Sequence, residues 1–225
     1  MNLLVSTVPR SGSTLLFNMS RLLFEQIYGK HETYATWVQF FQENKQKKHN
    51  IVKIHDRSEK FLKWSNKIIT CIRDLRYIIA SYADFVPNFN INDPNNLRNI
   101  CSTFVRIMDM NTSVAHYVFK YEDYFANKVQ TVIDVANTLE LPIKKINVSQ
   151  VLKELDEIKN KKYEKLDRGV TQMHPNHISP KSDADITHRI SREQICFIEN
   201  NFSSFFKKHN YKTSCLIKMM WKYGT

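Results

Sequence analysis

Residues 9–14, Pro-Arg-Ser-Gly-Ser-Thr, combine an arginine, hydroxyls and a glycine just before a stretch with helical spacing. Gly12 lets the backbone curl, and Arg10 brings a charged fork for an anion. The hydroxyls come from Ser11, Ser13 and Thr14. The start of a helix adds backbone N–H groups and a positive dipole end. We predict an anion site here; the alternative is an ordinary turn in which Ser13 or Thr14 caps the helix.

Arg73 and Ser81 form a second pair with the chemistry of a phosphate site. Arg73 follows a short apolar run, and Ser81 lies eight residues further on, about two turns into the next predicted helix. A guanidinium and a hydroxyl that converge there would bind a phosphate-sized group. The alternative is that Asp74 caps the helix, Arg73 pairs with a carboxylate and Ser81 lies on the helix surface.

Lys53 and His55 end another apolar run and alternate with Ile54. In a strand, this spacing points Lys53 and His55 to the same face. A histidine beside a lysine near an anion site is typical of a general base with an electrostatic partner. The alternative is a surface lysine and a strand-end histidine that bonds to the backbone.

Short apolar runs alternate with segments of helical periodicity along the chain. The predicted strands are residues 3–7, 50–55, 67–72 and 116–120. The predicted helices are 14–28, 33–45, 75–85, 97–110, 129–139, 148–159 and 191–207, and residues 168–189 are predicted to be a loop. This alternation predicts a single α/β domain over residues 1–225, a three-layer sandwich with a central parallel sheet flanked by helices. Ligands of such sheets bind at the carboxyl ends of the strands.

The composition narrows the class of protein. Lys and Arg number 33 against 22 Asp and Glu, and the net charge of +11 suits an anionic partner. With only four glycines, the chain has no G-x-G-x-x-G and no G-x-x-x-x-G-K-[ST] segment, so the dinucleotide fingerprint and the kinase glycine loop are absent and the chain is not a standard P-loop nucleotidase. No apolar stretch approaches 18 residues, so we expect no membrane span.

The four cysteines are Cys71, Cys101, Cys196 and Cys215, and none forms a C-x-x-C pair. Three lie in apolar runs, and no signal peptide is evident before Pro9. We therefore expect buried free thiols in a reducing compartment and a cytoplasmic location. We also expect no metal. The cysteines lack metal-ligand spacing, and His174, His177 and His188 could suggest a site, but histidines scattered in a loop are more often unliganded.

Together these motifs resemble those of the PAPS-dependent sulfotransferases. Residues 9–14 are similar to the P-[KR]-[ST]-G-[ST]-[ST] loop that binds the 5′-phosphosulfate of PAPS, 3′-phosphoadenosine 5′-phosphosulfate. Arg73 and Ser81 look like the pair that grips the 3′-phosphate, and Lys53-x-His55 resembles the K-T-H element with its histidine base. Tyr121-Glu122-Asp123 resembles the Y-E-D segment whose tyrosine lies by the adenine. Residues 177–179 echo the late 3′-phosphate loop through His177 and Ser179.

The resemblance implies a P-loop-NTPase-like sulfotransferase fold, with PAPS as cosubstrate, PAP (adenosine 3′,5′-bisphosphate) as product and no metal. His55 would take the proton of the acceptor while Lys53 and Arg10 stabilise charge on the leaving phosphate. Residues 11–14 would hold the 5′-phosphate. Aromatic residues after the first two motifs would favour a small phenolic or apolar alcohol as acceptor: Tyr34, Trp37, Phe40, Phe41, Phe85 and Phe89.

Some departures from the family pattern leave alternatives. Arg10 stands where many soluble members carry lysine, and Glu32 lies 22 residues later, close to where protein-tyrosine sulfotransferases place a catalytic glutamate. A protein-tyrosine or carbohydrate sulfotransferase with Glu32 as base is therefore an alternative. The usual late Arg-Lys-Gly is absent, so His177, Ser179 and Lys181 are the candidates to complete the 3′-phosphate site.

Two further alternatives belong to other classes. A nucleotide phosphotransferase would need a lysine directly after the loop glycine, where Ser13 stands. A non-catalytic polyanion binder accounts for the net charge but not for the ordered motifs, so nucleic acid is not an expected partner. Nothing in the sequence specifies an oligomeric state.

Overall fold

The computed structural model describes residues 1–160, 168–173 and 186–215. The chain divides into two compact units. Unit 1 consists of Met1–Ile72 and Ile107–Ile178, and unit 2 of Arg73–Arg106 and Ser179–Thr225. No helix within the described residues combines the length and the hydropathy that crossing a bilayer requires.

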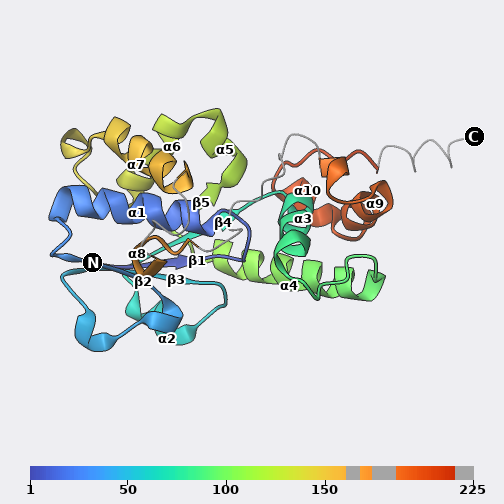
Figure 1. Ribbon diagram of the computed structural model, residues 1–225, viewed down its shortest axis with the longest axis horizontal. Helices are drawn as coiled ribbons and strands as arrows, with labels where there is room; N and C mark the ends of the chain where they lie inside the picture. The colour runs from blue at the N-terminus through green and yellow to red at the C-terminus, as the bar shows by residue number, and fades with distance from the viewer. Residues whose placement is uncertain (161–167, 174–185, 216–225) are drawn as a thin grey trace, which may run out of the picture. The chain divides into compact units, whose positions relative to one another are not determined.

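Unit 1 is built on a five-stranded sheet with the order β2-β3-β1-β4-β5 (Figure 1). Its strands are β1 (Asn2–Ser6), β2 (Thr33–Trp37), β3 (His49–Ile54), β4 (Lys67–Ile72) and β5 (Tyr117–Lys120). All four neighbouring pairs are parallel, which confirms the predicted parallel sheet. The carboxyl ends of the strands therefore share one edge of the sheet.

Helices cover both faces of this sheet, as the layered prediction requires (Figure 1). One face carries α1 (Ser13–Tyr28), α5 (Tyr121–Ala126), α6 (Lys128–Thr138) and α7 (Val148–Asn160), and the other carries α2 (Glu59–Trp64). Side chains alternate accordingly: Leu3 and Val5 belong to the core under α1, whereas Leu4 packs in the cluster that contains Phe61 of α2. Because both faces are covered, the central strands β1 and β4 are largely apolar runs.

The prediction of a helix over residues 33–45 is wrong. The segment forms edge strand β2 followed by two 3-10 turns, Val38–Phe40 and Glu43–Lys45. Thr33, Thr36 and their aromatic neighbours are β-branched or ring-bearing residues that fit a pleated surface. Pairing with β3 along all five residues of the strand decides between the two structures. The short helices α2 and α5 were not predicted from the sequence.

Unit 2 is helical. It contains α3 (Leu75–Phe85), α9 (Arg192–Asn201), α10 (Ser203–Lys208) and the first part of α4 (Pro94–Thr112), which crosses the unit boundary in sequence. The predicted capping box at Ser191 is confirmed, with both of its hydrogen bonds to Gln194. The helix predicted to reach residue 207 instead breaks at Phe202, and α10 follows.

The remaining short elements lie in the segments around the undescribed residues and after α6. A 3-10 turn, Ile143–Lys145, precedes α7. Within residues 168–189, which were predicted to be a loop, α8 (Arg168–Thr171) and a 3-10 turn, Ile186–His188, are formed. Residues 174–185 of that segment lie outside the described residues.

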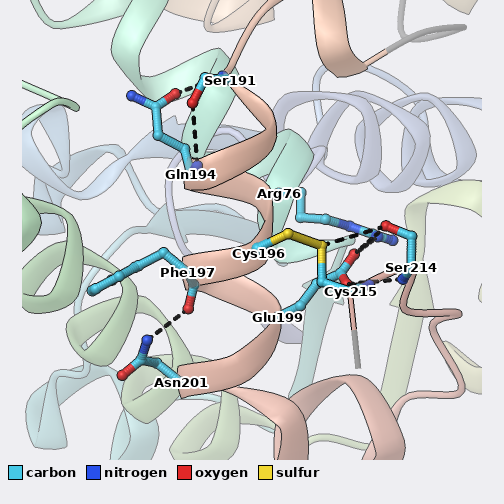
Figure 2. Close-up of a disulfide and its surroundings, with 9 residues drawn as sticks. All are labelled: Arg76, Ser191, Gln194, Cys196, Phe197, Glu199, Asn201, Ser214 and Cys215. Carbon is cyan, nitrogen blue, oxygen red and sulfur yellow. Dashed lines mark hydrogen bonds and ion pairs between the residues drawn. A yellow bond between two sulfur atoms is a disulfide. The ribbon is translucent and has the colours of Figure 1, made fainter. Parts of the chain in front are cut away.

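A disulfide joins Cys196 on α9 to Cys215, with 5.2 Å between their Cα atoms (Figure 2). The prediction of free thiols is therefore wrong for this pair, while Cys71 and Cys101 are free and buried. The chain turns back after α10 and so brings together two cysteines that are 19 residues apart in sequence. Disulfides are typical of oxidising compartments, so the cysteine argument for a cytoplasmic location loses its support.

Candidate functional site

The loop between β1 and α1 has the shape of an anion-binding turn. Gly12 is the N-cap of α1 with φ of 104°, and Arg10 also adopts a positive φ, of 65°. Two left-handed residues so close together curl the backbone around the start of the helix. The buried Ser11 hydroxyl donates to the carbonyl of Val8 at 2.8 Å and closes the loop. Ser11 thus shapes the loop with its hydroxyl.

Gly12 is required by its surroundings as well as by its backbone angle. A Cβ atom there would lie 2.4 Å from Cδ2 of Tyr121 and 3.3 Å from Sγ of Cys71. The Cys71 thiol donates to the backbone carbonyl of Ser11. The first residue of α5 and a thiol of β4 therefore hold the loop in place, and the structure brings Tyr121 to the predicted anion loop.

Lys53 lies beneath the start of α1 with its whole side chain buried. Its Nζ donates to Oγ1 of Thr14 at 3.0 Å and lies 5.0 Å from the ring centre of Trp37 and 5.8 Å from that of Phe17. Within the described part of the chain no carboxylate pairs with Lys53. Burial lowers the pKa of Lys53 to about 7. An unneutralised buried ammonium next to a helix start favours an anionic ligand, so Lys53 is not a surface lysine.

His55 follows the last residue of β3 and is half-buried. Its Nδ1 lies 3.2 Å from the carbonyl oxygen of Thr7, which can only accept a hydrogen bond. In the neutral ring Nδ1 therefore carries the proton, and the basic lone pair is on Nε2. The alternative interpretation, a strand-end histidine bonded to the backbone, holds for Nδ1 and is compatible with a base at Nε2.

Trp37 connects the two candidate catalytic groups. It ends β2 opposite Lys53, and its ring meets the His55 ring edge to face with 5.2 Å between centroids. The sequence placed Trp37 in an acceptor wall, but its contact with Lys53 depends on the strand that the helix prediction missed. Thr7, Phe17 and Cys71 were not predicted as site residues. They contribute through backbone and packing contacts, which leave no recognisable pattern of residue spacing in the sequence.

Glu32, the alternative base, lies at the amino ends of the strands, whereas the anion loop lies at their carboxyl ends. Its backbone carbonyl accepts from the amide of His49, which begins β3. Lys53 and His55 lie four and six residues after His49, about 13 and 20 Å along the chain at the usual rise per residue. The position of Glu32 in the structure therefore does not support a role as base beside Lys53 and His55.

The other aromatic residues expected in the acceptor wall do not lie together: some are in the core of unit 1, some are near its surface, and two belong to unit 2. Phe41 packs edge to face against Phe61 and Trp64 in the core below the sheet. The Tyr34 hydroxyl bonds to backbone groups of Phe40 and Gln42, and Phe40 is 60% exposed. Phe85 and Phe89 belong to unit 2.

The second predicted phosphate site lies at the start of α3 in unit 2. Arg73 follows the last residue of β4 in the chain, is buried, and lies over the ring of Tyr77 at 5.9 Å. Asp74 caps α3 by accepting from the amide of Arg76, as the alternative interpretation expected. Ser81 is buried rather than on the helix surface.

Several predicted late-loop residues, His177, Ser179 and Lys181, lie outside the described residues, as does His174. Among the residues that are described, no three His, Cys, Asp or Glu side chains gather as metal ligands would. The geometry of the described site thus consists of an anion loop, a buried lysine and an oriented histidine.

The fold was compared with those of known proteins. No protein-family model matches the sequence, and no curated protein matches it. A mouse sulfotransferase, SULT7A1, solved in complex with PAP, superposes with a TM-score of 0.63 over 99% of this chain and 89% of its own, at 13% identity. A retinol dehydratase in complex with retinol and PAP gives a TM-score of 0.54 over 92% and 81%, also at 13% identity. The fold is therefore the one that sulfotransferases have, as the resemblance implied.

Proposed function

We propose that this protein is a sulfotransferase that moves the sulfuryl group of PAPS to a hydroxyl or amine of a small acceptor and releases PAP. The observation that carries the proposal is that the Gly12 loop, Lys53 and His55 meet at one edge of the sheet in a sulfotransferase-like fold. Because motif residues occur in both units, we assign both to the single domain expected for residues 1–225.

The nucleotide contacts follow from the resemblance and from the loop geometry. Residues 10–14 hold the 5′-phosphosulfate through the helix start, the Ser13 and Thr14 hydroxyls and the Arg10 guanidinium, while the Ser11 hydroxyl closes the loop. Arg73 and Ser81 bind the 3′-phosphate, to which His177 and Ser179 are further candidates. Tyr121 lies by the adenine, and its packing on Gly12 supports this assignment.

The transfer step needs a base on the acceptor side and positive charge on the leaving side. Nε2 of His55 takes the proton as the acceptor oxygen or nitrogen bonds to sulfur, and the bond from sulfur to the bridging phosphate oxygen breaks. The electron pair of that bond stays on the 5′-phosphate of PAP. Lys53 and Arg10 stabilise the charge that develops there. Like phosphoryl transfer, the reaction depends on positioning and electrostatics and involves no metal in this proposal.

The acceptor proposed is a small phenol or an apolar alcohol. Trp37 presents an aromatic ring beside His55, and one apolar ring next to the base suits a ring or chain rather than a polar sugar. Phe40, exposed just after β2, is the second candidate for this contact.

Replacement of His55 by Gln tests the mechanism. We expect sulfuryl transfer to fall by a factor of about 100 or more, while PAP binding by calorimetry stays within about twofold of wild type, since the side chain does not hold the nucleotide. Glu32→Gln is the matched control and should keep full activity. Normal turnover by His55→Gln would overturn the assignment of the base, and loss of turnover in Glu32→Gln would favour Glu32 as the base instead.

A further inference from the structure

Glu199 on α9 is a fully buried carboxylate that serves three segments of unit 2 (Figure 2). Its Oε2 accepts from the backbone amides of Ser214 and Cys215 at 2.8 and 2.7 Å. Its Oε1 accepts from the Ser214 hydroxyl at 3.4 Å and pairs with Nη1 of Arg76. A buried charge is tolerated only when it is well paired, so each partner of Glu199 is held in a defined place.

Arg76 links Glu199 to Asp74, the residue that caps the start of α3. Its Nε and Nη2 bind the carboxylate of Asp74, whose Oδ1 also accepts from the backbone amide of Arg76 and so caps the helix. Its Nη2 donates to the carbonyl of Lys212 at 3.0 Å. Burial by itself would lower the pKa of Arg76, but the Asp74 and Glu199 carboxylates raise the pKa above its ordinary value. The guanidinium is therefore a permanent cation that joins α9, residues 212–215 and the cap of α3.

The disulfide holds the donors of Glu199 in place. The chain turns back at Asn210, where φ is 57°, and the amide of Tyr211 bonds to the carbonyl of Phe206. Residues 212–215 then reach α9, where Cys215 is bonded to Cys196, three residues before Glu199. Positions three apart lie on the same side of a helix, so the disulfide holds the amides of residues 214 and 215 at the carboxylate.

We propose that Glu199 and the Cys196–Cys215 disulfide are positioning elements for 3′-phosphate recognition, acting through Arg76 and Asp74 on the neighbouring Arg73. This inference rests on the proposed function, in which Arg73 and Ser81 bind the 3′-phosphate of the nucleotide. A fixed N-cap at residue 74 fixes the backbone from which the Arg73 side chain extends. Recognition of the 3′-phosphate then depends on the state of the disulfide.

Reduction releases this restraint. A dithiol reductant gives one electron and one proton to each sulfur, so the Cys196–Cys215 bond breaks, two thiols form and the reductant becomes a disulfide. Residues 212–215 are then tethered by hydrogen bonds alone, and the entropy that the closed 19-residue span had removed returns. Glu199 loses its two fixed amide donors, and the Arg76 and Asp74 side chains lose their single arrangement.

The test compares two nucleotides that differ only in the 3′-phosphate. Affinities of PAP and adenosine 5′-phosphate are measured by calorimetry on the whole protein, before and after treatment with dithiothreitol, with thiol titration as a check. Because Cys71 and Cys101 are buried, the thiols are titrated in denaturant, where we expect two before treatment and four after it. Reduction should weaken PAP binding by about tenfold, the loss of one charge-assisted hydrogen bond, and leave adenosine 5′-phosphate binding unchanged.

Variants separate positioning from general stability. Glu199→Gln, with the disulfide intact, should lose the preference for PAP, and the Cys196→Ser/Cys215→Ser double variant should show low PAP affinity that no longer responds to reductant. Glu193→Gln is the matched control, because Glu193 lies exposed in the first turn of the same helix. The reductant experiment on the wild-type chain decides the question even if a substituted chain fails to fold.

The outcomes distinguish this inference from the proposed function. An equal preference for PAP over adenosine 5′-phosphate in the oxidised and reduced wild type would overturn the inference and leave the proposed function standing. Four titratable thiols before reduction would overturn it as well. Failure of the oxidised protein to prefer PAP at all would overturn both.

Discussion

Replacement of Lys53 by Met tests the electrostatic core of the site, because methionine keeps most of the apolar stem and removes the charge. Lys53 is fully buried, and the Thr14 hydroxyl is its one hydrogen-bond acceptor within the described residues. Such a charge is costly in the empty protein and useful only when an anion is bound. We therefore expect the substitution to stabilise the protein and to destroy its activity.

The size of the effect follows from the pKa of Lys53, which burial lowers from 10.5 to about 7. Between these two values the unfolded chain binds the proton more tightly than the folded chain, so stability rises as the pH rises through this window. At about 1.4 kcal/mol per pH unit, the cost of the ammonium at neutral pH is about 4 kcal/mol. The lost bond to Thr14 and the cation–π contact with Trp37 offset about 2 kcal/mol of it.

The net gain expected for Lys53→Met at pH 7 is therefore about 2 kcal/mol, or a rise in Tm of about 5 °C for a chain of this size. Thermal and urea unfolding at pH 7, 8.5 and 10 measure it, and the advantage should shrink as the pH approaches 10. Transfer from PAPS should fall by a factor of about 100 or more, as for loss of one donor to developing charge.

Ligand binding provides the control for this prediction. When PAP binds near Lys53 the ammonium is stabilised, so at pH 8 wild-type binding should take up a proton, measured by calorimetry in buffers of different ionisation enthalpy. Lys53→Met should lack that uptake. A variant that is less stable than wild type at pH 7, or that transfers sulfate normally, would refute the reasoning.

Three other predictions concern the loop and its neighbours. Gly12→Ala should weaken PAP binding by at least about tenfold, because φ is positive and the new Cβ would collide with Tyr121. Gly29→Ala, also at positive φ but against the exposed side chain of His31, should lose stability without losing PAP affinity. Normal affinity in Gly12→Ala would show that the loop does not hold the nucleotide. The cation–π contact with Trp37 favours the charged form of Lys53, so Trp37→Leu should lower the pKa of Lys53. The decrease of kcat/KM for PAPS at alkaline pH should then begin at a lower pH, by less than about one unit. An unchanged pH profile would contradict this. Tyr121→Ala should weaken PAP and adenosine 5′-phosphate binding to the same degree, whereas a selective loss of one would argue against a contact with the adenine.

Much of unit 1 follows from the sequence because its central strands, β1 and β4, are buried on both faces and are largely apolar runs. Period-two alternation predicted that Lys53 and His55 share one side of the strand, and in the structure both lie next to the Trp37 ring. The same reasoning failed over residues 33–45, since an edge strand with closely spaced aromatic residues imitates helical periodicity. Only the pairing of β2 with β3, a long-range contact, distinguishes the two structures.

The contacts that could not be predicted are those between side chains far apart in sequence. Nothing in the spacing of Cys196 and Cys215 indicates that the chain turns back at Asn210. A glutamate within an amphipathic helix, such as Glu199, also looks like a solvated surface residue until the partners that neutralise it are placed. Because such networks require three segments to meet, one-dimensional periodicity does not reveal them.

The central claim is transfer of a sulfuryl group from PAPS, and the most direct measurement follows ³⁵S-labelled PAPS with a panel of phenols, apolar alcohols, sugars and a tyrosine peptide. We predict label on phenols or apolar alcohols, stoichiometric release of PAP and no requirement for added metal. Absence of label on every acceptor, together with tighter binding of ATP–Mg²⁺ than of PAP, would contradict the account.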